Sequence, residues 1–148
     1  MSKITAISGR VVYNSRGSKT IEVDVESDGK FLGRVCAPSG ASVGKFEAVS
    51  FPNNSPEESL SILNQNSDKF IGIDSSDLKQ VHDAIHSIDD TDNYAKIGGA
   101  CAFAITIAAT ESAAKAENKQ FFQMISDKSD LKFPFPLGNI LGLSLIHI

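Results

Sequence analysis

The stretch at residues 21–37, IEVDVESDGKFLGRVCA, carries the strongest fold signal in the chain. Its first half, Ile21-Glu22-Val23-Asp24-Val25-Glu26, alternates apolar and acidic residues, which is the period of a strand with one buried face. Asp28-Gly29 suits the positive φ angles of a tight hairpin turn, and residues 31–37 form the returning strand. Because residues 4–13 are rich in β-branched side chains, the chain is predicted to open with a three-stranded antiparallel meander.

Helices are predicted to fill the rest of the chain. Ser55-Pro56-Glu57-Glu58 is a capping box with proline in the first turn, so a helix begins there and runs to about Phe70. A second, amphipathic helix is predicted to start near Asp74. The Ala-rich residues 97–118 lack a polar face, which predicts a helix buried against several neighbours, and 119–127 form a short final helix. The predicted fold class is therefore α+β, with about four helices after the meander.

Length and composition exclude several classes of protein. A chain of 148 residues with 41% hydrophobic and 22% charged residues suits one globular domain rather than a disordered segment. The net charge of -4 argues against a nucleic-acid partner, and no apolar run approaches the length of a membrane span. The first residues, Met1-Ser2-Lys3-Ile4-Thr5, lack a secretory signal. We therefore expect a cytoplasmic protein in which Cys36 and Cys101 are buried free thiols.

Three motifs are candidates for chemistry on residue pattern alone. The small-residue loop at 38–44 lacks the ending of a phosphate-binding P-loop, because Lys45 is followed by Phe46. His82 and His86 are spaced by one helical turn but have no third ligand, so a solvated pair is favoured over a metal site. Asp89-Asp90-Thr91-Asp92 lacks the spacing of a calcium loop and is interpreted as a solvated turn. These patterns alone assign no activity.

Several motifs nevertheless occur in a fixed order along residues 3–142. They are Asn14-Ser15-Arg16-Gly17, Thr20-Ile21-Glu22-Val23-Asp24, Pro38-Ser39-Gly40-Ala41-Ser42-Val43-Gly44, Glu47-Ala48, Ile88-Asp89-Asp90-Thr91, Gly98-Gly99-Ala100 and Pro134-Phe135-Pro136-Leu137-Gly138-Asn139-Ile140-Leu141-Gly142. In order and spacing they resemble the N-terminal domain of enolase, which usually carries Asp-Ser-Arg-Gly-Asn-Pro-Thr and Pro-Ser-Gly-Ala-Ser-Thr-Gly. Asn14, Ser18-Lys19 and Val43 depart from that pattern and indicate a divergent branch of the family.

The resemblance implies an Mg²⁺-dependent lyase that converts 2-phosphoglycerate to phosphoenolpyruvate and water in glycolysis and gluconeogenesis. In that family the Lys base, the Glu acid and the acidic metal ligands belong to the barrel domain that follows. We therefore assign no catalytic residue to this chain and expect the chain alone to be inactive.

The resemblance also implies roles for particular residues. The loop implied to close over the substrate comprises Pro38, Ser39, Gly40, Ala41, Ser42 and Gly44. Within it, Ser42 is the implied ligand of the second Mg²⁺, because hydroxyl and carbonyl oxygens suit a hard cation. Arg10 and Glu22 match positions that pair across the enolase dimer, which implies a homodimer or a higher homo-oligomer.

The resemblance divides the chain into a loop-bearing N-terminal domain at 1–132 and the first strand of a truncated barrel domain at 133–142. The last residues, 143–148, read Leu-Ser-Leu-Ile-His-Ile, which is one translated frame of an adapter used in transposase-based sequencing libraries. We expect them to be an artefact rather than a native ending. Two other interpretations stay open: the capping domain of a different enolase-superfamily dehydratase or racemase, and a stand-alone binding module.

Overall fold

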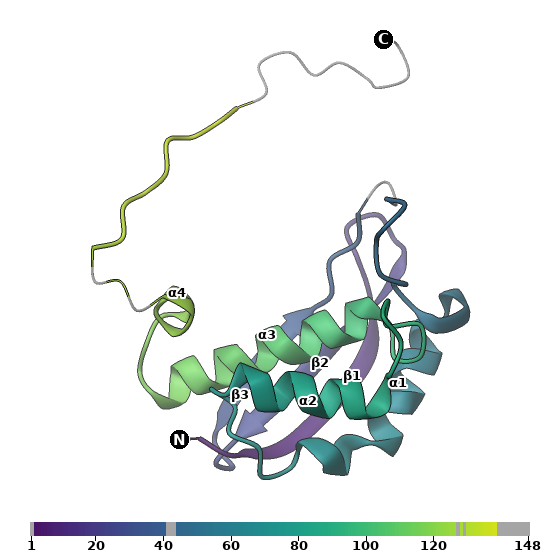
Figure 1. Ribbon diagram of the computed structural model, residues 1–148, viewed down its shortest axis with the longest axis horizontal. Coiled ribbons are helices and arrows are strands. Elements are labelled where there is room, and N and C mark those ends of the chain that lie inside the picture. The colour runs from purple at the N-terminus through teal and green to yellow at the C-terminus, as the bar shows by residue number, and fades with distance from the viewer. Residues whose placement is uncertain (1, 41–43, 127, 129, 139–148) are drawn as a thin grey trace.

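A computed structural model of the chain describes residues 2–40, 44–126, 128 and 130–138. Its elements are β1 (Ile4–Tyr13), β2 (Lys19–Ser27), β3 (Phe31–Cys36), η1 (Pro52–Asn54), α1 (Pro56–Gln65), η2 (Ser67–Phe70), α2 (Leu78–Ile88), α3 (Gly99–Ala116) and α4 (Phe121–Ile125). The strands form one antiparallel sheet in the order β1-β2-β3, and the helices follow (Figure 1). The predicted α+β class, a three-stranded meander followed by about four helices, is confirmed.

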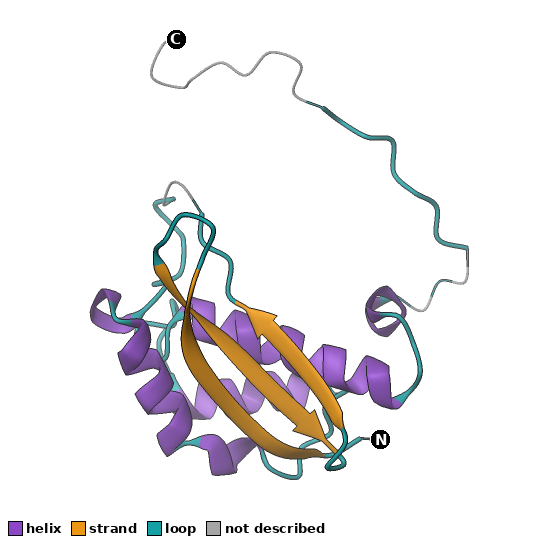
Figure 2. Cartoon of the chain, turned by 180° about the vertical axis from the view of Figure 1, so that it is seen from behind, coloured by secondary structure: helices purple, strands orange, loops and turns teal. Residues whose placement is uncertain are grey.

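Helices cover one face of the sheet and leave the other face open (Figure 2). The central strand β2 turns Ile21, Val23 and Val25 towards the helices, where each has no exposed surface. Its alternate acidic residues are only half-buried on the open face. At the turn into β3, Asp28 and Gly29 have φ angles of 54° and 64°, as the predicted hairpin requires. The alternating pattern at 21–26 therefore assigned these side chains to the correct faces.

Helix α3 packs on β2 and β3 at unusually short range, because small residues meet on both sides. A Cβ atom at Gly33 of β3 would lie 1.9 Å from the carbonyl oxygen of Ala108 in α3. Four residues further along α3, the hydroxyl of Ser112 bonds the hydroxyl of Ser27 and the carbonyl of Phe31, both at 2.7 Å. The prediction that this Ala-rich helix is buried against several neighbours is confirmed.

The first helix begins where the sequence predicts and ends earlier. The Ser55 hydroxyl caps α1 by accepting a hydrogen bond from the backbone amide of Glu58 at 3.2 Å. The Glu58 carboxylate completes no reciprocal box, because it accepts from the Asn53 side chain instead. The helix ends before Asn66, whose side-chain amide bonds the carbonyl of Ile62 at 2.8 Å. The residues that follow form the short 3₁₀ turn η2 rather than a continuation of α1.

Helix α2 starts at Leu78 rather than near Asp74, because a local turn at Asp74–Asp77 precedes it. The Asp74 carboxylate accepts from the backbone amide and hydroxyl of Ser76, a side-chain turn that competes with helix formation. The N-cap is Asp77, which accepts from the backbone amide of Gln80 at 3.1 Å. Helices α3 and α4 both lie within their predicted ranges.

The two cysteines differ, and the prediction that both are buried is wrong for one of them. Cys36 is exposed on the open face of the sheet, and its thiol bonds the Glu22 carboxylate at 3.0 Å. That hydrogen bond, together with partial burial, raises the pKa of the Cys36 thiol to about 11. Cys101 is buried in α3, where desolvation raises its pKa to about 12. Both thiols are therefore protonated and weak nucleophiles at neutral pH.

Residues 130–138 extend away from the sheet and helices (Figure 1). Residues 130–138 form neither helix nor strand, and the side chains of Phe133, Phe135 and Leu137 are almost completely exposed. The rest of the predicted barrel strand, 139–142, and the adapter-like residues 143–148 lie outside the described residues. The predicted boundaries after residues 132 and 142 stay predictions. Among the described residues, none of the helices has the length and hydropathy needed to cross a membrane.

The contact between Gly33 and α3 leads to a stability prediction. Replacing Gly33 with Ala places a methyl group inside the backbone of α3, so helix and strand must separate. We expect the free energy of unfolding, measured by urea titration, to fall by about 3 kcal/mol. Gly138→Ala is the matched control, because a Cβ at that position meets no atom within 4 Å. A loss at Gly33 no larger than that of the control would contradict the close packing.

Candidate functional site

The loop between β3 and α1 lies beside the turn between β1 and β2 (Figures 1 and 2). A single guanidinium nitrogen joins the two segments. Nη2 of Arg16 donates to the carbonyl of Ser39 at 2.8 Å, to the hydroxyl of Ser39 at 3.0 Å and to the carbonyl of Gly40 at 2.9 Å. The first half of the predicted substrate-covering loop is therefore bound to the turn that carries the Asn14-Ser15-Arg16-Gly17 motif.

The turn that holds Arg16 is itself closed by Asn14. The side-chain oxygen of Asn14 accepts from the backbone amides of Arg16 at 2.9 Å and Ser18 at 3.0 Å. The backbone amide of Asn14 donates to the carbonyl of Ser18 at 2.9 Å, and Gly17 adopts a φ of 73°. Both side-chain bonds need only an acceptor oxygen, which explains why Asn can replace the usual Asp at position 14.

The second half of the loop closes on itself. The Glu47 carboxylate accepts from the backbone amide of Gly44 at 2.8 Å, and the backbone amide of Glu47 donates back to the Gly44 carbonyl at 3.2 Å. Phe46, between them, is 93% exposed. Ala41 and Ser42 lie outside the described residues, so the structure does not place the predicted metal ligand.

The segment after Glu47 is bound to the start of α3. The backbone amide of Gly99 donates to the Val49 carbonyl at 2.7 Å, and that of Ala100 donates to the Ser50 carbonyl at 3.2 Å. Gly98 has a φ of 88°, and a Cβ there would lie 2.6 Å from the Ser50 carbonyl oxygen. The pair Gly98-Gly99 is therefore needed for a close approach of two backbones, which anchors the loop to the core.

Asp89 organises the connection between α2 and α3. Its carboxylate is buried with no exposed surface, and it accepts from the amide and hydroxyl of Thr91. The other oxygen accepts from the backbone amides of Lys96 and Ile97, both at 2.8 Å. Burial alone would raise the pKa of Asp89, but these hydrogen bonds hold it below its usual value. The interpretation of a solvated turn is wrong for Asp89, although its neighbour Asp90 is exposed and pairs with Lys96.

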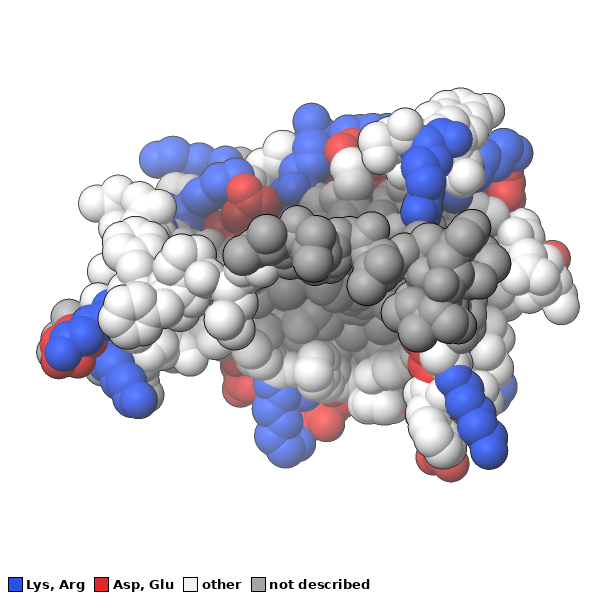
Figure 3. All heavy atoms as spheres, turned by 90° about the horizontal axis from the view of Figure 1, so that it is seen from above, with Lys and Arg blue, Asp and Glu red and all other residues white. Residues whose placement is uncertain are grey.

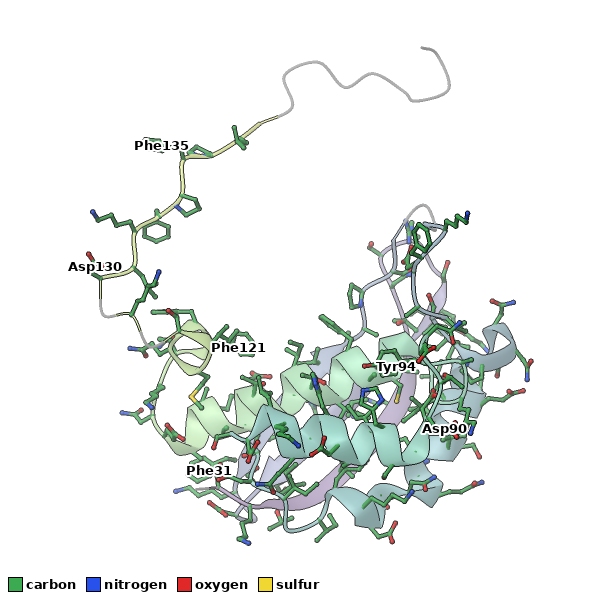
Figure 4. The ribbon with its side chains drawn as sticks, in the orientation of Figure 1. Phe31, Asp90, Tyr94, Phe121, Asp130 and Phe135 are labelled. Atoms are coloured by element: carbon green, nitrogen blue, oxygen red, sulfur yellow. The ribbon has the colours of Figure 1, made fainter. Side chains whose placement is uncertain are left out.

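An open groove of about 400 Å³ lies beside the loop, between α2 and α3. Its apolar wall includes Phe103 and Ile107 of α3, and Glu47 and His82 supply polar groups. The two histidines of α2 do not converge, because the His86 ring stacks on Tyr94 with centroids 5.5 Å apart. Figure 4 shows Tyr94 over α2. Within the described ranges, His, Cys, Asp and Glu side chains form no group of three that could hold a metal ion.

The sequence is similar to known proteins along most of its length. It matches the family described as enolase, N-terminal domain, over residues 4–125. It is 37% identical over 144 residues to an enolase of Halorubrum lacusprofundi. The aligned region covers 96% of this chain and 35% of that relative. An enolase of Methanosphaera stadtmanae is 34% identical over 142 residues, covering 95% of this chain and 34% of the relative. The chain belongs to the enolase family. It spans about a third of the length of these curated relatives.

The open face of this enolase domain carries the two residues predicted at a dimer interface. Arg10 of β1 lies opposite Glu22 of β2, and the two side chains form an ion pair within the chain. Beside them, Arg34 holds Asp24 through two hydrogen bonds of 2.7 Å. The Arg34 guanidinium lowers the pKa of Asp24 below its usual value. The structure is of one chain and leaves the dimer prediction for Arg10 and Glu22 untested.

Charge on the face shown in Figure 3 is mixed. In the view of Figure 3, basic and acidic side chains are interspersed over the described part of the surface. No uninterrupted basic surface is seen on this face among the described residues.

The buried carboxylate of Asp89 leads to a pH-dependent prediction. Asp89→Asn turns one acceptor oxygen into a donor that faces two amide donors, so we expect a loss of about 2 kcal/mol in unfolding free energy at pH 7. The pKa of Asp89 is lower in the folded state than its unfolded value near 4. Its stabilising contribution is therefore present above about pH 4 and is lost as the pH falls through the folded pKa.

The prediction is tested by urea unfolding of the parent chain and the Asp89→Asn variant between pH 3 and pH 7. The difference in unfolding free energy between the two should shrink towards acid pH. Asp90→Asn, next to Asp89 but exposed, should leave stability nearly unchanged at pH 7. An Asp89→Asn difference that stays constant across this pH range would contradict the assignment.

Proposed function

We propose that the full-length protein dehydrates 2-phosphoglycerate to phosphoenolpyruvate and water, and that this chain supplies the loop that covers the substrate. The observation that carries the proposal is the match to the enolase N-terminal domain over residues 4–125, within which the loop at 38–44 departs from the family pattern only at Val43. The structure adds support, because both ends of the loop are fixed to the folded core. The proposal places this reaction in glycolysis and gluconeogenesis, in the cytoplasm.

The loop acts by enclosing the substrate rather than by moving protons. Arg16 binds the first stem of the loop, residues 38–40, and α3 binds the second stem, residues 49–50. Only the residues between the two stems therefore need to rearrange. Closure of such a loop excludes water from a highly charged intermediate, which strengthens each electrostatic interaction in the site. The general base and acid then come from the remaining two thirds of the full-length protein.

Magnesium fits this division of labour. When bound, the ion stabilises the negative charge of the enolate intermediate. Oxygen atoms are the ligands that Mg²⁺ prefers, and Ser42 would offer its hydroxyl and carbonyl oxygens. The described residues of this chain contain no cluster of carboxylates that could bind the ion alone. We therefore assign one loop ligand to this chain and the carboxylate ligands to the rest of the protein.

The same proposal includes a homodimer or a higher homo-oligomer that uses the open face of the sheet. Arg10 and Glu22 lie side by side on that face, and the Arg10 side chain is half exposed. In a dimer, Arg10 and Glu22 would break this internal ion pair, and each would pair instead with the oppositely charged residue of a second copy. Such an exchange keeps each charge paired, so it carries a small desolvation cost.

A chimera tests the proposed reaction. Residues 1–138 of this chain are joined to the remaining part of the Halorubrum lacusprofundi enolase, and phosphoenolpyruvate formation is followed by its ultraviolet absorbance. We expect turnover that requires Mg²⁺, whereas the 148-residue chain alone should give none. A folded chimera that forms no phosphoenolpyruvate would contradict the proposal and favour another dehydratase, a racemase or a binding module.

The assigned ligand has a test of its own in the same chimera. Ser42→Ala removes the side-chain oxygen, so turnover should fall at least about tenfold and the Mg²⁺ concentration for half-maximal activity should rise. The matched control is Ser61→Ala, which removes an exposed hydroxyl on α1. If the Ser42 variant keeps both the turnover and the Mg²⁺ requirement of the parent, Ser42 is not a ligand.

A further inference from the structure

The Arg16 guanidinium binds the start of the loop from a separate turn of the chain. It projects from the β1–β2 turn and donates to three oxygens of Ser39 and Gly40, at 2.8 to 3.0 Å. These residues are separated from Arg16 by more than twenty positions in sequence. No carboxylate in the described part of the chain forms an ion pair with Arg16, so its charge serves these hydrogen bonds.

The base of this arginine is fixed in place. Asn14 accepts from the backbone amides on both sides of the turn, and strand β1 pairs with β2 up to Tyr13 and Lys19. The side chain therefore extends from a rigid support rather than from a free loop. A donor on such a support can impose a geometry on the segment that it binds.

The bonded segment is one that needs such restraint. Gly40 has no side chain, and a glycine backbone samples a wider range of conformations than any other residue. Two of the accepting oxygens are the backbone carbonyls of Ser39 and Gly40, so the bonds fix two successive peptide planes. Hydrogen bonds from a charged donor are about twice as strong as neutral ones. Because Arg16 is exposed, they can still break and re-form.

We propose that Arg16 is a positioning residue that holds the stem at 38–40 in one conformation and so sets the direction in which the loop leaves the sheet. The restraint on the stem is a property of this chain alone. Its consequence for turnover rests on the proposed function, because it matters only if the loop covers a substrate.

The restraint is tested by ¹⁵N relaxation on the 148-residue chain. In the parent, Ser39 and Gly40 should have order parameters of about 0.85, and in Arg16→Gln these should fall below about 0.6. The backbone of Asn14 and Gly17 should stay rigid, which separates a loosened stem from a disrupted turn. The control Lys30→Gln removes a cation from the opposite end of the sheet, where its ammonium lies over the Phe31 ring. Unchanged order parameters at Ser39 and Gly40 in Arg16→Gln would overturn the proposal.

The consequence for turnover is tested in the active chimera. Arg16→Gln should lower kcat/KM by about tenfold with a rise in KM, because a loose stem must be ordered each time the substrate binds. A merely structural role would reduce the amount of folded enzyme and leave KM unchanged. Arg16→Lys, whose ammonium can still donate to several oxygens, should recover part of the loss.

The relaxation experiment and the chimera kinetics test separate claims, so either claim can be contradicted without the other. An inactive chimera contradicts the proposed function and leaves the restraint to be judged by relaxation alone. A loosened stem with unchanged kcat and KM would overturn the role of Arg16 in turnover. A rigid stem in Arg16→Gln overturns the positioning role whatever the chimera does.

Discussion

The close approach of α3 to the sheet is the constraint on which the rest of this structure depends. Gly33 lies so near to Ala108 and the backbone of Ser112 that no side chain fits between strand and helix. At this distance the alanines of α3 fill the space over β2, and the hydroxyl of Ser112 reaches the polar groups of the hairpin. Larger residues would move the helix outwards and open cavities along the whole contact.

The position of α3 in turn determines where the loop is attached. The amides of Lys96 and Ile97, immediately before the helix, are held by the buried carboxylate of Asp89. The next residues, Gly98 and Gly99, permit the chain at 49–50 to bond the first turn of α3. The core, the turn after α2 and the second stem of the loop are therefore one connected unit.

Much of this could be predicted from the sequence, where the signal was local. The alternation at 21–26 assigned the faces of β2, and Asp28-Gly29 marked the hairpin turn. The absence of a polar face identified α3 as a buried helix. The order of motifs identified the family, and the match over 4–125 confirms it.

The features that the sequence did not predict depend on interactions between distant residues or on short turns that compete with helices. Asp89 is buried because amides seven and eight positions away turn back to it, which an acidic cluster does not indicate. The contacts of Arg16 join two turns that are far apart in sequence. The first helix stops early because the Asn66 side chain satisfies a carbonyl of its last turn. The role of Ser42 came from the family pattern and lies outside the described residues.

Native-state hydrogen exchange measured for individual amides tests the role of the α3 contact most directly. If α3 and the sheet form one cooperative core, the amides of α3 at 104–112 and those of β2 at 21–25 should exchange only through global unfolding, with the same free energy. Amides of α4 and of residues 44–47 should exchange at lower free energy, since they lie outside that contact. Exchange of α3 well below the global free energy, while β2 stays protected, would show that the sheet does not depend on the helix.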